Sequence, residues 1–101
     1  MKSKTVIEPE SYILPSDAGE MKKFIDKFKI DMMENIVSQI QLAIENKLPM
    51  VEVFTFANSP FVVTLSKEEF DMNLEHIEKF YSEEEIFELV PHVKEVRQLL
   101  K

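Results

Sequence analysis

The fold of this chain is decided by residues 21–47, MKKFIDKFKIDMMENIVSQIQLAIENK, a stretch without proline. Its apolar side chains recur at three- and four-residue intervals and form one stripe along a helix. The stripe consists of Met21, Phe24, Ile25, Phe28, Met32, Ile36, Ile40 and Ile44. Asp17 with Glu20 three residues later is a capping box, which marks a helix start. The stretch therefore predicts one helix of about 40 Å that ends near Asn46, ahead of Pro49.

A β-hairpin is predicted after this helix. β-Branched and aromatic residues fill 50–56 and 61–65, and the loop 57–60 between them reads Ala-Asn-Ser-Pro, which is typical of a hairpin. Apolar residues occupy both alternating sets of strand positions, whereas a hairpin with one solvated face has polar residues at every second position. We therefore expect other parts of the protein to cover both faces of the hairpin.

Two strands alone are only marginally stable, so a third is expected. The N-terminal segment 1–16 is partly extended and holds two β-prone pieces, 5–7 and 12–14, which Pro9 and Pro15 limit to short edge strands. The alternative source is the hairpin of a second subunit, which predicts a homodimer. Its interface would be built from Val53, Phe54, Phe56, Phe61, Val62 and Val63.

Capping boxes predict two further helical regions. Ser66 with Glu69 opens a helix that extends to about Tyr81, and Ser82 with Glu85 opens the last region. The apolar face of the first is Phe70, Leu74, Ile77 and Tyr81. The apolar face of the second is Ile86, Leu89 or Val90, Val93, Val96 and Leu100.

Pro91 predicts a kink in the last helical region, or its division into two short helices, because proline lacks the backbone N–H that a helix interior needs. The order of elements predicts a single α+β domain over residues 1–101. It consists of a long N-terminal helix, a central hairpin with a possible short third strand, and two or three C-terminal helices.

Composition excludes several classes of function. The chain of 101 residues has no cysteine and one glycine, which excludes thiolate metal sites and glycine-rich phosphate loops. Its first ten residues lack the apolar run of a signal peptide, and no stretch is apolar enough to span a membrane. We expect a cytoplasmic protein without cofactor, metal or catalytic residues. His92, with Glu88 and Glu95 nearby, is interpreted as part of a surface pair on a helix.

The net charge of the protein lies in one quarter of the chain. Residues 66–90 hold nine acidic and two basic residues, a net charge of −7, while the other 76 residues are balanced. The pI is near 4.8 and the only arginine is Arg97. Direct binding to nucleic acid or to an anionic membrane is therefore not expected, because phosphate binding needs clustered basic residues.

Helix capping explains some of these acids but not all. Acidic side chains in a first helical turn gain roughly 0.3–1 kcal/mol each from the macrodipole, which accounts for those that follow Ser66 and Ser82. By contrast, the like-charge pairs Asp71–Glu75 and Glu84–Glu88 each cost roughly 0.2–0.5 kcal/mol in a helix. Four acids are expected on the helix face opposite the apolar one. They are Glu68, Asp71, Glu75 and Glu78.

A row of anions on a helix resembles the charge pattern of DNA-mimic inhibitors, small acidic proteins, often phage-encoded, that occupy the nucleic-acid site of a basic protein. The resemblance implies a non-enzymatic inhibitor that competes with nucleic acid for such a partner. The predicted partner-binding residues are Glu68, Asp71, Glu75, Glu78, Glu84 and Glu88. The alternatives are an immunity, antitoxin or assembly protein that binds through the apolar hairpin or the C-terminal helix, and a plain solvated acidic face.

Overall fold

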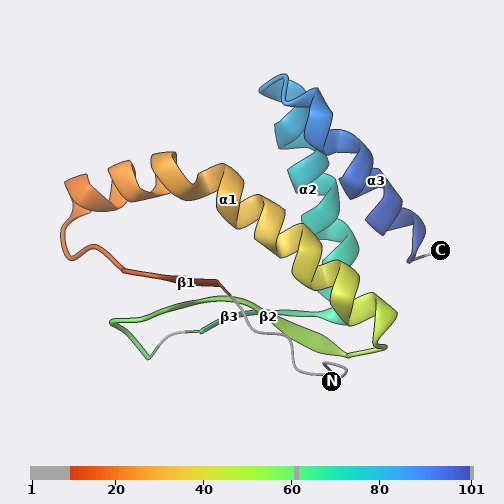
Figure 1. The fold of residues 1–101 in the computed structure, drawn as a ribbon, viewed down its shortest axis with the longest axis horizontal. Helices are drawn as coiled ribbons and strands as arrows, with labels where there is room; N and C mark the ends of the chain where they lie inside the picture. The colour runs from red at the N-terminus through yellow and green to blue at the C-terminus, as the bar shows by residue number, and fades with distance from the viewer. Residues whose placement is uncertain (1–9, 61, 101) are drawn as a thin grey trace, which may run out of the picture.

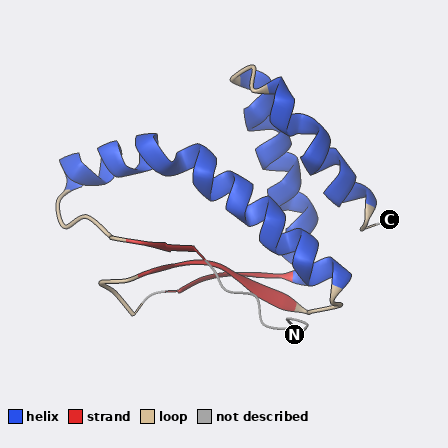
Figure 2. Cartoon of the chain, viewed as in Figure 1, coloured by secondary structure: helices blue, strands red, loops and turns tan. Residues whose placement is uncertain are grey.

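In the computed structural model, which describes residues 10–60 and 62–100, a three-stranded sheet lies beneath three helices. All three helices lie on the same side of the sheet, and α2 and α3 form an antiparallel pair that rises away from it (Figures 1 and 2). The elements are β1 (Glu10–Tyr12), α1 (Ala18–Glu45), β2 (Met50–Phe56), β3 (Val62–Ser66), α2 (Phe70–Glu83) and α3 (Val90–Gln98), with 3-10 turns at Lys67–Glu69 and Phe87–Leu89. The predicted α+β class and element order are confirmed.

The long helix begins and ends where the sequence predicts. The carboxylate of Asp17 accepts a hydrogen bond from the backbone N–H of Glu20 over 2.9 Å, and Asn46 is the C-terminal cap. Only the second half of α1 enters the core, where Val37, Ile40 and Ala43 are fully buried. The predicted apolar stripe is therefore wrong for part of the first half: Ile25 is 44% exposed.

The third strand comes from this chain. β1 pairs in parallel with β2, so that Tyr12 lies beside Phe56, and β2 pairs antiparallel with β3. The end of β1 is fixed to the hairpin loop by Asn58, whose side chain exchanges two hydrogen bonds of 2.8 Å with the backbone of Leu14. Of the two β-prone pieces, 12–14 contributes one residue to β1, while 5–7 lies outside the described residues, as does Phe61.

A β-bulge decides which face of the sheet is apolar. The pairing of β2 with β3 shifts between Glu52 and Phe54, so Val53 is an extra residue without a partner. A bulge reverses the alternation of side chains along its strand. Val51 and Val53, before the shift, and Phe54 and Phe56, after it, therefore all lie toward α1.

The other face of the sheet is mostly polar. It carries Glu52, Thr55 and Thr64, with Met50 and Val62 among them. The expectation that both faces of the hairpin need cover is thus wrong, because the sequence alternation was counted without the bulge.

The helical half of the molecule contains one confirmed capping box and one that is wrong. The backbone N–H and hydroxyl of Ser66 both donate to the carboxylate of Glu69, over 2.8 and 3.1 Å, and open the turn that leads into α2. Ser82 lies in the last turn of α2 and begins no helix. Pro91 lies in the first turn of α3, where its missing N–H costs nothing. The predicted kink or division at Pro91 is therefore wrong, because the helix begins there and has no earlier part to bend or divide.

One core joins the sheet to the three helices. Its side chains are Val37, Ile40, Ala43, Val51, Val53, Phe70, Leu74, Ile77, Tyr81, Val93 and Val96. The apolar face predicted for α2 is buried in full, and Val93 and Val96 from the predicted face of the last helix are buried with it. Among the described residues, no helix is long and apolar enough to cross a membrane.

Candidate protein-binding site

Two of the acids predicted on α2 form ion pairs within the chain, and both pairs share one arginine. Arg97 of α3 donates through Nε to Asp71 over 3.1 Å and through Nη1 to Glu78 over 3.2 Å. The arginine side chain is only 26% exposed, so these ion pairs fix α3 against α2. Sequence reasoning considered Arg97 only as a possible phosphate ligand. Its place directly after Val96 in the apolar stripe of α3 was the available signal that it lies beside α2.

Glu68 and Glu75 remain as free anions on this surface. Both are exposed, and neither takes part in an ion pair among the residues that the structure describes. The predicted row of four anions on α2 is therefore interrupted by Arg97, and its two free members lie on either side of Asp71 in the sequence.

A second group of acids lies at the turn between α2 and α3, the end of the molecule farthest from the sheet (Figure 1). We call this group the acidic tip. It consists of four acids, Glu83, Glu84, Glu85 and Glu88, and of Phe87, which lies between them. All five side chains are exposed, Phe87 to 60%. No described basic residue forms an ion pair with any of the four carboxylates.

The backbone of the acidic tip is a helix C-terminus. The N–H of Ile86 donates to the carbonyl of Tyr81 over 2.8 Å, and the N–H of Glu85 donates to that of Ser82 over 3.2 Å. These two bonds form a Schellman motif, whose left-handed residue is usually glycine. Here that residue is Glu85, with φ of 59°. The sequence interpretation of Glu83, Glu84 and Glu85 as first-turn acids is therefore wrong.

Three charges of the acidic tip, those of Glu83, Glu84 and Glu85, oppose the stability of α2. Carboxylates at a helix C-terminus lie at the negative end of the macrodipole, where each costs roughly 0.3–1 kcal/mol. The end of α1 is the opposite case, because the same motif there places a lysine, Lys47, at the left-handed position with φ of 57°. Helix stability thus explains Lys47, and it explains Glu88 in the turn that leads into α3, but it does not explain Glu83, Glu84 and Glu85.

The side chains predicted to form a dimer interface lie in several environments. Val53 is 0% exposed and has no surface left for a second subunit. Phe54, Phe56 and Val63 are partly buried beneath α1, whereas Val62 is 44% exposed on the open face. Phe61 lies outside the described residues. The homodimer stays a prediction, and Val62 is the most accessible described member of its interface.

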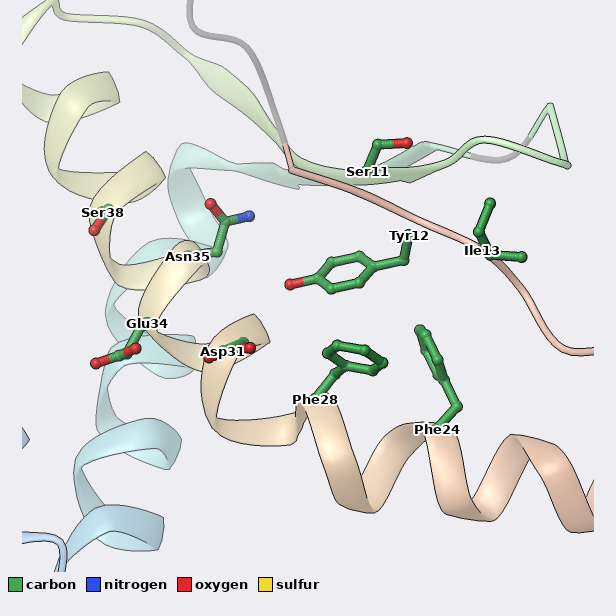
Figure 3. Close-up of a pocket in the computed structure, with 9 residues that line it drawn as sticks. All are labelled: Ser11, Tyr12, Ile13, Phe24, Phe28, Asp31, Glu34, Asn35 and Ser38. Atoms are coloured by element: carbon green, nitrogen blue, oxygen red, sulfur yellow. The ribbon is translucent and has the colours of Figure 1, made fainter.

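A hollow of about 670 Å³ lies between β1 and α1. Figure 3 shows Tyr12 pointing from β1 toward α1, where Phe24 and Phe28 meet it. The ring of Tyr12 lies 5.8 Å from that of Phe24 and 5.5 Å from that of Phe28. Because these rings contact one another edge to face, they attach β1 to the first half of α1. Within the described residues, no group of three or more His, Asp or Glu side chains could hold a metal ion.

Comparisons of the chain with protein-family models, with curated proteins and with solved structures find no match.

Proposed function

We propose that this protein is a non-enzymatic binding protein whose acidic tip, together with Glu68 and Glu75, engages a basic surface on another protein. The sharpest form of the proposal is a DNA mimic: an inhibitor that occupies the nucleic-acid site of its partner and competes with nucleic acid for it. The observation that carries it is the placement of three unpaired carboxylates, those of Glu83, Glu84 and Glu85, at the negative end of α2, where they reduce the stability of that helix.

Phe87 supports a binding role for the same surface. A phenyl ring that is 60% exposed contributes little to folding, but an aromatic side chain among charged residues is a common anchor in protein interfaces. The carboxylates would steer a basic partner toward the tip, and the ring would then be buried on contact.

The acids of α2 contribute unequally in this proposal. Glu84 and Glu88 belong to the tip, and Glu68 and Glu75 extend the negative surface along α2. Asp71 and Glu78 already share Arg97, so their charge is partly compensated before any partner arrives. Attraction to a partner should therefore depend mainly on the four unpaired predicted residues.

The proposal is tested by capture of basic proteins on two matched variants. One carries Glu84→Lys with Glu88→Lys, and the other carries Glu52→Lys with Glu95→Lys, at exposed positions away from the acidic tip. Each pair of substitutions changes the net charge from −7 to −3, so the two differ only in where the charge is reversed. The immobilised proteins are exposed to a lysate fraction retained on heparin and eluted with a salt gradient.

We expect the wild type and the second variant to retain a partner that elutes at moderate salt and is displaced by duplex DNA, because screening weakens exposed charge pairs. The first variant should lose it. Equal retention by both variants would contradict the proposal. Retention through high salt would instead favour an interaction module that binds through apolar side chains, for which Met50 and Val62, 53% and 44% exposed on the open face of the sheet, are available.

A further inference from the structure

A second cavity, separate from the acidic tip, lies where the three helices meet. Its volume is about 290 Å³. The lining residues are Glu34, Val37 and Ser38 of α1, Tyr81 of α2, Leu89 of the turn before α3, and His92 and Val93 of α3. Glu34 and Ser38 are exposed while Val37 and Val93 are buried, so the cavity opens past the first two and is closed by apolar side chains behind. Figure 3 shows Glu34 and Ser38 one turn apart on α1, away from the phenylalanine rings.

One residue that lines this cavity, Tyr81, carries an unpartnered hydroxyl. Tyr81 is 1% exposed, and its Oη has no hydrogen-bond partner among the described residues. A buried polar group without a partner is costly and rare in folded proteins. Since Tyr81 also lines the cavity, a bound molecule there could supply the missing hydrogen bond.

The other polar groups of the cavity define what such a molecule must offer. Glu34 has no ion pair among the described residues, and Ser38 adds a second hydroxyl. The Nε2 atom of His92 lies 2.8 Å from Oε1 of Gln41, so the sequence interpretation of His92 as part of a surface pair is wrong. No lysine or arginine lines the cavity. A carboxylate and two hydroxyls favour a ligand that donates hydrogen bonds and carries positive charge.

We propose that this cavity binds a small primary alkylammonium ion. Its ammonium group donates to the carboxylate of Glu34 and the hydroxyls of Ser38 and Tyr81, and its alkyl stem lies against Val37, Leu89 and Val93. An ammonium has three N–H donors and no acceptor, which matches three acceptor groups. An anion would be repelled by Glu34, and a neutral apolar molecule would leave the Tyr81 hydroxyl unpaired.

Ordered water is the competing occupant, because water can satisfy a buried hydroxyl in a polar cavity. The two occupants are distinguished by titration of the 15N-labelled protein with three four-carbon probes: n-butylammonium, 1-butanol and butyrate. We expect saturable amide shifts in the segments that line the cavity, with affinity for butylammonium at least about tenfold above that for butanol. Butyrate should produce no saturable shift there.

Three variants locate the site. Glu34→Gln and Tyr81→Phe should each weaken butylammonium binding about tenfold, the loss expected for one charge-assisted hydrogen bond. Glu52→Gln removes an exposed carboxylate on the open face of the sheet and should bind as the wild type does. If Tyr81→Phe does not fold, Ser38→Ala at an exposed helix position replaces it. The proposal is overturned if butanol binds as tightly as butylammonium, or if none of the cavity variants alters the titration.

Discussion

Arg97 of α3 and Asp71 of α2 form an ion pair in which Nε lies 3.1 Å from Oδ1. The same guanidinium reaches Glu78 of α2, so one cation joins two acids that are about two turns apart on that helix. A half-buried arginine that bridges two carboxylates is geometrically restrained, unlike an isolated pair of exposed side chains. The contact therefore gives Asp71 and Glu78 a structural role that the unpaired acids Glu68 and Glu75 lack.

The first prediction concerns this contact. Asp71→Asn should lower the free energy of unfolding by about 0.5–1 kcal/mol, the upper range for an exposed ion pair, and Arg97→Gln should lower it further because both acids lose their partner. Glu75→Gln is the matched control, since Glu75 is an exposed acid on α2 without an ion pair among the described residues. Urea denaturation at low and high salt measures the effect. A loss for Glu75→Gln as large as that for Asp71→Asn would refute the structural role.

The second prediction tests the one-sided sheet. Val53→Ala should destabilise the protein by about 2 kcal/mol, because it removes two buried methyl groups from the core. Val62→Ala, the same change at a residue that is 44% exposed, should cost less than about 0.5 kcal/mol. Chemical denaturation of the two variants gives the comparison directly. Similar losses at both positions would mean that the open face of the sheet is covered in solution, as in a dimer.

Helix α2 and the sheet illustrate what the spacing of apolar residues along the sequence can and cannot predict. The apolar face of α2 was fully predictable, because residues three and four apart on a helix necessarily share a face. The side of the sheet on which Phe54 lies was not predictable. One residue without a partner, Val53, reverses the alternation of side chains along β2, and no local sequence signal marks it. Ser82 was misinterpreted for a different reason. Its sequence matches a capping box, but α2 continues to Glu83 and is ended by the hydrogen bond from the N–H of Ile86 to the carbonyl of Tyr81, so Ser82 lies inside a helix and begins none.

The candidate site was predictable only in part, for the same reason. The sequence placed Glu84 and Glu88 in a negative region, but it assigned Glu83, Glu84 and Glu85 to the favourable end of a helix. Phe87 lies outside the apolar face predicted for the last helical region, and this was the available signal that its side chain is exposed. The pairing of Arg97 with α2 depends on how two helices pack, which spacing along one chain does not specify.

The third prediction concerns the left-handed residues that end α1 and α2. Lys47→Gly and Glu85→Gly should each raise the free energy of unfolding by about 0.5–1 kcal/mol, because non-glycine residues are strained at positive φ. Glu85→Gln distinguishes the effect of the charge from that of the backbone conformation. It should raise the free energy of unfolding by less, because it removes only the unfavourable interaction of the carboxylate with the macrodipole. Ser82→Gly, within α2, is the control that should destabilise. Thermal and urea unfolding measure all four, and a loss on Glu85→Gly would exclude strain at the tip.

The fourth prediction follows from the burial of Tyr81. Burial, with the charge of Glu34 as a smaller cause, raises the pKa of Tyr81 from its ordinary value of 10.0 to about 12. The folded state therefore holds this proton more tightly than the unfolded state does. The resulting stabilisation is fully present below pH 10 and is lost as the pH rises from 10 to 12, by on the order of 2 kcal/mol.

Tyr81→Phe provides the control for that loss. The variant has no hydroxyl to titrate, so this part of the decline in stability should be absent between pH 10 and 12. At neutral pH it should be as stable as the wild type or more stable, because it removes a buried unpaired group. Urea denaturation across this pH range tests both statements. A variant clearly less stable at neutral pH would show that the hydroxyl has a partner in solution.

The last prediction separates folding from binding at the acidic tip. Phe87→Ala should leave the free energy of unfolding nearly unchanged, since the ring is 60% exposed, yet weaken partner binding by about 2 kcal/mol or more if the ring is an interface anchor. Leu99→Ala is the matched control, because Leu99 is 47% exposed at the end of α3, away from the tip. Calorimetric titration of both variants with the captured partner measures the difference. Because the ring carries no charge, its contribution should persist at high salt while that of Glu84 and Glu88 declines. Equal binding by Phe87→Ala and the wild type would mean that the ring does not contribute and that only the carboxylates of the tip bind the partner.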